Sequence, residues 1–357
     1  MRRNCKLQIE FAHALAGAAP KRICNLQSLL RPLVAFVTLL AWSGAALAQD
    51  DVVHRRNGIV DRGKILAQDA NGVRLLRADS KKETLIPADQ IDRIEVKLSA
   101  DQQEGEKLFE QKKYRAAAEK LDAAFKIETR PWLRSRIASN MVACYVAMGD
   151  PVAAIDAFFA ASQAADGQIA WSAVPIWWLP EPPNQDVIET AATMLRSNSP
   201  LQQVIGASYL LGTNQAPAAR EALAKLTTYR DERIGQLART QLWRWYAATA
   251  THDDVISWQR QAAKLPADAR AGPYFAIGLA LRRLGSHDDA ALAFLWPAVV
   301  YRTDPKLSGR AALLAAESLE RAGQLGEARR MYEEVIGRFA QTAEAVSAQA
   351  RLNALKE

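Results

Sequence analysis

The spacing of apolar residues along the chain changes once, near residue 98. Before that point apolar residues come in short runs divided by turn-forming residues, a pattern typical of strands. Asn71-Gly72 between two runs predicts a tight hairpin, because both central positions of such a turn favour positive φ. Pro87–Gln90 predicts one helical turn before the last run. The predicted strands are Ile59-Val60, Lys64–Gln68, Val73–Arg77, Thr84–Ile86 and Ile91–Val96.

Residues 49–97 are therefore predicted to form a small β domain, with Gly63 and Asp79–Lys82 interpreted as breaks between strands. Five short strands with a helical turn before the last one resemble a small SH3-like or Sm-like barrel. Some Sm-like barrels bind RNA, so the distribution of charge along the chain decides whether RNA binding is expected here.

From Ser99 onward apolar residues recur every three or four positions, which predicts helices. Ser99, with Gln102 three residues later, predicts a capping box at the first of them. Small residues, large apolar residues and a glycine then recur at fixed offsets 38 residues apart. Small residues let two helices pack closely, and glycine ends the first helix of a pair. The two sets are Gly278, Leu281, Gly285, Ala290 and Phe294, and Ala316, Leu319, Gly323, Ala328 and Tyr332.

These offsets resemble tetratricopeptide (TPR) repeats, helix pairs of about 34 residues that stack into an α-solenoid. The pattern departs from the family at Val142, Gln259 and Pro297, and Pro297 predicts that its helix ends early or kinks. A weaker copy begins near Ile234, and a final helix at Ala343–Lys356 is expected to cap the stack. The N-terminal copies consist of Gly105, Leu108, Tyr114, Ala117, Leu121 and Ala124, and of Met141, Tyr145, Gly149, Ala154, Phe158 and Ala161.

The resemblance implies a mainly α fold, in which a TPR-type α-solenoid follows a small five-stranded β-barrel-like domain. Repeat pairs are expected at residues 98–167 and again at 234–357, where the last helix caps them. Such stacks bind other proteins through a groove lined by their first helices, so the resemblance implies a binding protein.

Residues 168–233 interrupt the repeat pattern with a segment rich in Trp and Pro. The prolines of Trp171–Pro183 exclude a regular helix there, because each removes a backbone donor and restricts the residue before it. Helices are predicted to resume at Asp186–Arg196 and after the N-caps Ser199 and Asn214. The later part loosely resembles HEAT-type helix pairs, so the solenoid is expected to continue from end to end.

The net charge of +7 comes mostly from the N-terminus, where residues 1–48 hold six Lys and Arg against Glu10. The remaining 40 Lys and Arg face 38 Asp and Glu, which leaves no basic surface of the kind that binds nucleic acid. A basic leader, the apolar run Leu33–Trp42 and the sequence Ala46-Leu47-Ala48 predict an export signal cleaved between Ala48 and Gln49. We expect a protein of the periplasm or cell envelope, or a secreted one. Only an uncleaved signal would anchor it to a membrane.

Candidate chemistry is sparse along the chain. Cys144 is the only cysteine after the leader, and its apolar surroundings predict a small buried core residue. His252–Asp254 and His287–Asp289 repeat the sequence His-Asp-Asp, which is either a metal-ligand pair or, at one repeat period, two helix starts with acidic caps. No phosphate-binding loop, paired-Cys metal motif, haem attachment site or nucleophile elbow occurs. The chain is therefore predicted to be no enzyme and to use no cofactor.

Two surfaces remain as candidate binding sites. In the TPR family the first helices line the groove, and here the corresponding residues mix apolar and Arg side chains that suit a peptide or helix of another protein. The subfamily that grips a C-terminal carboxylate uses Lys and Asn, which these positions lack, so that activity is not implied. A merely solvated helix face is the alternative. The predicted groove residues are Phe275, Leu279, Arg282, Arg283, Arg310, Leu313, Glu317, Glu320 and Arg321.

The second candidate is an aromatic platform formed by Trp171, Trp177 and Trp178, which could bind a sugar chain or an extended peptide. Packing of these indoles against neighbouring helices is the alternative. The sequence as a whole predicts a non-enzymatic, exported, protein-binding scaffold. A carbohydrate-binding or cell-wall accessory protein that acts through the Trp-rich segment is the second possibility.

Overall fold

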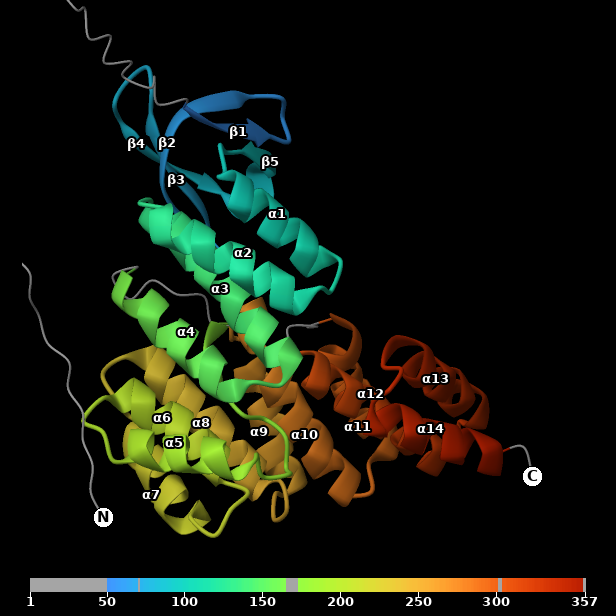
Figure 1. Cartoon of the computed structure of the whole chain (residues 1–357). Coiled ribbons are helices and arrows are strands. Elements are labelled where there is room, and N and C mark those ends of the chain that lie inside the picture. The colour runs from blue at the N-terminus through green and yellow to red at the C-terminus, as the bar shows by residue number, and fades with distance from the viewer. Residues whose placement is uncertain (1–49, 70, 165–172, 301–303, 356–357) are drawn as a thin grey trace, which may run out of the picture. The chain divides into compact units, whose positions relative to one another are not determined.

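A computed structural model describes residues 50–69, 71–164, 173–300 and 304–355. Fourteen α-helices follow five strands in this part of the chain (Figure 1). The prediction of a mainly helical chain that begins with a small five-stranded sheet is confirmed. The predicted export signal and Trp171 lie outside the described residues.

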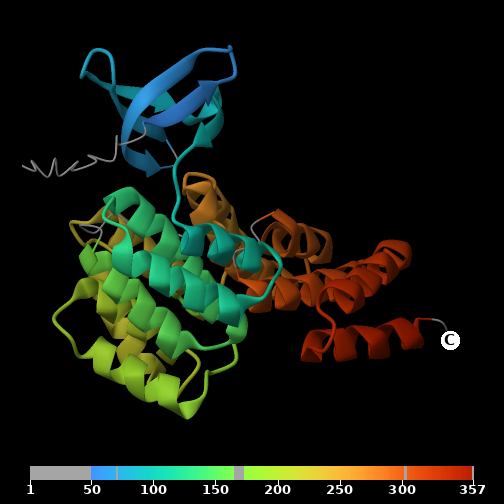
Figure 2. The same cartoon turned by 45° about the horizontal axis from the view of Figure 1, so that its top comes forward.

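The five strands form one antiparallel sheet in the order β4-β3-β2-β1-β5. Figure 2 shows this sheet in blue. No pairing joins β4 to β5 among the described strands, so closure into a barrel is not observed. The strands are β1 (Asp51–Arg55), β2 (Val60–Asp69), β3 (Gly72–Arg77), β4 (Glu83–Pro87) and β5 (Ile91–Glu95), and a 3-10 turn at Ala88–Gln90 precedes the last, as predicted.

Two strand predictions were wrong. The sequence predicted a break at Gly63 between the strands Ile59-Val60 and Lys64–Gln68, but Gly63 lies inside β2. In addition, β1 was not predicted. A Cβ at Gly63 would lie 2.1 Å from the carbonyl oxygen of Leu76, so the glycine allows a close strand approach and does not mark a turn. The hairpin between β2 and β3 is confirmed, although Gly72 pairs with Asp69 as the first residue of β3.

The core of the sheet is completed by a helix. Val53, Ile65, Val73, Leu75 and Ile86 pack against the first turn of α3, whose Trp132 and Leu133 are buried. At the same junction the Nη2 of Arg130 donates to the carbonyl of Lys97 at 2.8 Å and pairs with Glu128 at 2.9 Å. The β segment therefore shares its core with the helical segment.

The helices follow the sheet in mostly sequential contact. They are α1 (Ala100–Glu110), α2 (Tyr114–Ile127), α3 (Pro131–Met148), α4 (Pro151–Ala164), α5 (Gln185–Leu195), α6 (Pro200–Leu210), α7 (Ala216–Leu226), α8 (Glu232–Tyr246), α9 (His252–Ala262), α10 (Ala271–Arg283), α11 (His287–Leu295), α12 (Pro305–Arg321), α13 (Leu325–Arg338) and α14 (Ala343–Ala354).

Four helix pairs share one turn geometry, at the position where the repeat pattern placed glycine. Gly149, Gly285 and Gly323 all have φ between 74° and 80°, and Lys112 takes the same left-handed conformation with φ 60°. In each pair the next residue donates its N–H to a carbonyl five residues earlier, which satisfies an otherwise free helix end. These bonds are Lys113 to Leu108 and Asp150 to Tyr145 at 2.9 Å, Ser286 to Leu281 at 3.0 Å, and Gln324 to Leu319 at 2.9 Å.

Small residues allow close contact within these pairs, as their spacing predicted. A Cβ at Gly105 would lie 2.9 Å from the Leu121 side chain, and one at Gly278 would lie 2.6 Å from the Phe294 ring. Both contacts join residues 16 positions apart in the sequence. The same offset joins Ala316 to Tyr332, both of which are buried.

We expect Gly278→Ala to lower the free energy of unfolding by about 1–3 kcal/mol, because the added methyl group forces the buried Phe294 ring to move. Gly337→Ala is the matched control, since nothing lies within 4 Å of a Cβ at this exposed helical glycine. Urea unfolding of both variants measures the difference. A Gly278 variant as stable as the Gly337 variant would contradict the packing argument.

The helix caps and the helix end at Pro297 agree in part with the sequence predictions. Ser99 caps α1 by accepting from the Gln102 N–H at 3.1 Å, but the Gln102 side chain donates to Glu106 instead of closing a capping box. Ser199 caps α6 as predicted, whereas Asn214 does not cap α7, which begins after Gln215. At Pro297 the α-helix has ended, and a π-helix covers Trp296–Val300.

An uninterrupted solenoid is not established by this arrangement. Beyond the sequential contacts, α3 also touches α12, which lies far from it in the chain. Within the described residues no helix is both long and apolar enough to cross a membrane.

Candidate functional site

The segment between α4 and α5 joins two hydrophobic clusters. Its described part, residues 173–184, is irregular, as its prolines predicted. Trp177 packs with the cluster around α5 to α8, and its ring lies 5.6 Å from that of Tyr209. Trp178 packs with the cluster of the C-terminal helices and covers Gly272, where a Cβ would lie 1.9 Å from its indole. The two indoles thus face different cores.

Arg244 of α8 fixes this segment in place. Its Nη1 donates to the backbone carbonyl of Trp177, to the carbonyl of Ser208 at 2.9 Å and to Oε1 of Gln241 at 2.9 Å. The Trp177 N–H in turn donates to the Ser208 hydroxyl at 3.0 Å. Burial lowers the pKa of Arg244 to about 10, so the guanidinium stays charged at neutral pH. Sequence reasoning missed this residue, because no local pattern shows which carbonyls it will meet.

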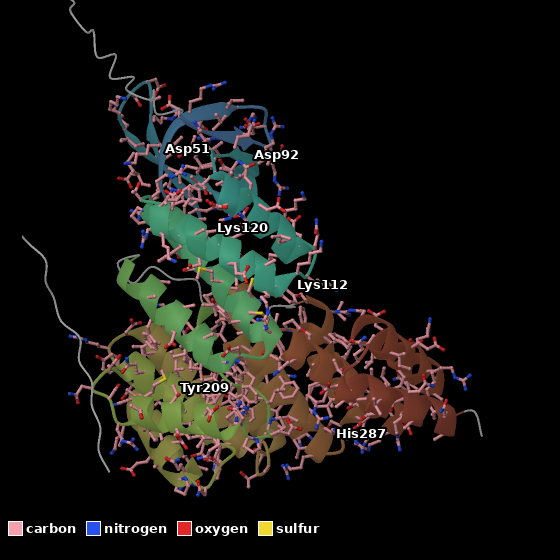
Figure 3. The ribbon with its side chains drawn as sticks, in the orientation of Figure 1. Asp51, Asp92, Lys112, Lys120, Tyr209 and His287 are labelled. Atoms are coloured by element: carbon pink, nitrogen blue, oxygen red, sulfur yellow. The ribbon has the colours of Figure 1, made fainter. Side chains whose placement is uncertain are left out.

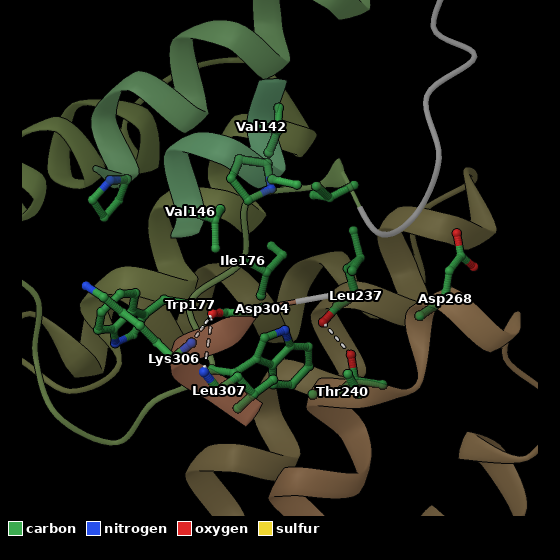
Figure 4. Close-up of a pocket in the computed structure, with 18 of the residues that line it drawn as sticks. Val142, Val146, Ile176, Trp177, Leu237, Thr240, Asp268, Asp304, Lys306 and Leu307 are labelled. Atoms are coloured by element: carbon green, nitrogen blue, oxygen red, sulfur yellow. Dashed lines mark hydrogen bonds between the residues drawn. The ribbon is translucent and has the colours of Figure 1, made fainter. Parts of the chain in front are cut away.

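A cavity of about 100 Å³ lies beside the segment (Figure 4). Six parts of the chain line it: the α3–α4 turn, the Trp segment, α6, α8, the approach to α10, and the start of α12. Its walls are mostly apolar, and Trp177, Trp178 and Tyr209 contribute rings. Figure 3 shows that Tyr209 lies among the packed helices, where it is 3% exposed.

Asp304 lines the cavity and is the N-cap of α12. Its Oδ1 accepts the N–H groups of Lys306 at 2.8 Å and Leu307 at 3.2 Å. Burial raises the pKa of Asp304, and these two bonds together with the Lys306 charge only partly offset the effect. Asp304 was also missed, although Asp followed by Pro305 is a recognisable helix start.

The predicted groove residues separate into three groups. Phe275 and Leu313 are buried in the C-terminal core, with 0% and 1% exposure, and do not line a surface. Glu320 also acts internally, because it accepts the Tyr332 hydroxyl at 2.6 Å and pairs with Arg351 of the last helix at 2.6 Å.

The second group consists of arginines already engaged in structural contacts. Arg283 donates to the carbonyls of Ala247 and Ala250 after α8, and Arg310 pairs with Glu181 of the Trp segment at 2.7 Å. Arginine side chains near helix ends satisfy free carbonyls in this way. Arg282 pairs with Glu317 at 2.5 Å, and burial lowers the pKa of Arg282 despite that carboxylate.

The third group, Leu279 and Arg321, lines an open hollow on the surface together with Arg282 and Arg283 of the second group. We call Leu279, Arg282, Arg283, His287 and Arg321, which line it, the arginine face. Arg321 is exposed and forms no ion pair or hydrogen bond with the described residues. Nδ1 of His287 is buried without a hydrogen-bond partner in the described structure. The face therefore carries cationic groups around the apolar side chain of Leu279.

The remaining candidates have structural positions. His252 and His287 each begin a helix, and Asp254 completes a capping box with Thr251. Across the described residues no group of three or more His, Cys, Asp or Glu could hold a metal ion. Burial raises the pKa of Cys144 to about 12, so the thiol is not poised to react near neutral pH.

Trp177 and Trp178 are half-buried, and the Nε1 of Trp177 donates to the Glu181 carbonyl at 2.8 Å. Both side chains line the cavity, and the predicted platform with Trp171 includes a residue outside the described part of the chain.

Comparison with known proteins gives no assignment. No protein-family model matches the chain, and no curated protein matches it.

Proposed function

We propose that this protein is a non-enzymatic, exported scaffold whose helix pairs, similar to TPR repeats, bind a protein segment at the arginine face. The export signal predicted at residues 1–48 supports the location outside the cytoplasm. The sequence offsets of the helix pairs support the class of repeat protein. The shared left-handed turns at Lys112, Gly149, Gly285 and Gly323 add geometric support for repetition.

The arginine face is the observation on which the binding role depends. Glu317 neutralises Arg282, while Arg321 beside Leu279 has no ion-pair partner among the described residues. A partner that complements this surface carries a carboxylate next to an apolar side chain, since charge fixes register and apolar contact adds affinity. The proposed partner is an acidic, amphipathic segment of another protein.

The test uses one arginine that can be changed without disturbing the fold. Partners captured by the chain from a bacterial envelope extract are identified, and the affinity of the purified partner is measured. Arg321→Glu is expected to weaken binding by about tenfold or more, because attraction becomes repulsion. Arg260→Glu on α9 is the matched control, since Arg260 is also exposed and forms no hydrogen bond or ion pair with the described residues.

Equal affinities for the two variants would reject the arginine face. The export part of the proposal is checked separately, by sequencing the N-terminus of the protein recovered from cells. The expected first residue is Gln49, and a chain that retains residues 1–48 in the cytoplasm would contradict export.

A further inference from the structure

The cavity beside the Trp segment contains a carboxylate oxygen that has no partner among the described residues. Asp304 uses only Oδ1 to cap α12, and its Oδ2 accepts no hydrogen bond from the described residues. The side chain lies in the cavity wall among the lining residues (Figure 4). A carboxylate held there is only partly solvated, so a positive group placed against it would be stabilised.

The carboxylate of Asp304 favours a cation in the cavity. Among the described residues that line the cavity, Lys306 is the cationic one. The Lys306 ammonium points away from the Asp304 carboxylate in Figure 4 and lies against Gly149, where a Cβ would meet Nζ at 2.6 Å. No ion pair joins these two groups among the described residues, and the Lys306 charge only partly offsets the effect of burial on the Asp304 pKa.

The remaining walls suit the methyl groups of such a cation. Trp177, Trp178 and Tyr209 present aromatic rings to the cavity, and ring faces attract organic cations, Trp most strongly. The volume of about 100 Å³ is below the roughly 150 Å³ of a cavity that accepts benzene. The part of a ligand that fits inside this cavity is therefore smaller than a benzene ring.

We propose that this cavity binds a small free organic cation, an alkylated ammonium group whose N–H donates to Oδ2 of Asp304 and whose methyl groups contact Trp177, Trp178 and Tyr209. This site is separate from the arginine face and does not depend on the protein-binding role. Either proposal can fail while the other holds.

The test is a titration of the full chain with trimethylammonium chloride at pH 7, followed by the indole N–H signals of Trp177 and Trp178 in NMR spectra. For a ligand of this size we expect a Kd of about 1 mM. Tert-butyl alcohol, similar in shape and uncharged, is expected to bind at least about tenfold more weakly, because it lacks the charge that ring faces and the carboxylate attract.

Asp304→Asn removes the charge but keeps the oxygen that caps α12, and it is expected to weaken trimethylammonium binding at least about tenfold. Asp231→Asn makes the same change at the N-cap of α8, outside the cavity lining, and is expected to bind like the wild type. Thermal unfolding verifies that both variants fold. If Asp304→Asn does not fold, the comparison of trimethylammonium with tert-butyl alcohol on the wild type decides whether the cavity prefers a cation.

The proposal is overturned by the absence of saturable shifts with trimethylammonium, by equal affinity for the alcohol, or by unchanged affinity in folded Asp304→Asn. Sedimentation of the protein with phosphatidylcholine vesicles, without any shift from the free ion, would overturn the assignment to a free ligand.

Discussion

Replacing Asp61 by Ala is expected to lower the free energy of unfolding by about 3–5 kcal/mol, because it leaves charged partners without compensation. The Asp61 side chain is fully buried in β2 between Arg55 of β1 and Arg77 of β3. Nε of Arg55 donates to its Oδ2 at 2.6 Å, and Arg77 donates to Oδ1. Without the carboxylate, two guanidinium groups on the strands that flank β2 repel each other beside the core.

The same sheet offers a matched control. Glu83 of β4 pairs with Arg74 of β3 at 3.5 Å, and both side chains are about half exposed, at 51% and 48%. Exposed pairs contribute about 0–1 kcal/mol, so Glu83→Ala is expected to change stability little. Chemical unfolding of both variants measures the difference. Similar losses would show that burial of Asp61 is not what makes its ion pairs important.

Replacing Leu133 by Ala is expected to lower the free energy of unfolding by about 2–5 kcal/mol, the usual range for a buried leucine that leaves a cavity. Leu133 is 0% exposed and fills the core of the sheet from α3. Because sheet and helices share this core, the loss is expected to affect both together. Circular dichroism and the indole N–H signal of Trp132 in NMR spectra should therefore report one shifted transition.

Leu292→Ala is the control for the leucine change, since Leu292 on α11 is 61% exposed and little packing is lost. A fragment of residues 49–97 provides a second test, because it lacks Trp132 and Leu133. We expect that fragment alone to give the poorly dispersed NMR spectrum of an unfolded chain. A well-folded fragment would show that the sheet folds as an independent domain, and would contradict the shared core.

The helix pairs were predictable because their determinants are local. Gly278 meets Phe294 and Gly105 meets Leu121 within one pair, across a single turn, so fixed offsets in the sequence report the contact directly. The left-handed turn is equally local, since only a few backbone bonds define it. Lys112 shows the limit of this reasoning, because it takes the glycine conformation without being glycine.

The strands were less predictable, since pairing with distant residues decides them. Glycine is common at breaks between strands, yet close pairing with β3 makes Gly63 an interior position of β2. The assignment of surface residues failed for the same reason. The repeat register placed Phe275 and Leu313 in a groove, and packing by later helices buries both.

The sequence by itself determined the helical class, the positions of the paired helices and the irregular Trp segment, because periodicity, capping and proline act over a few residues. Only the tertiary structure decided which charges remain free at the surface. Arg283, Arg310 and Glu320 are held by groups 33, 129 and 31 positions away, and Arg321 forms no ion pair with the part of the chain that the structure describes. The cavity at Asp304 arises in the same way, since six separated parts of the chain enclose it. Contacts at such separations depend on how the whole chain folds, and no local pattern encodes them.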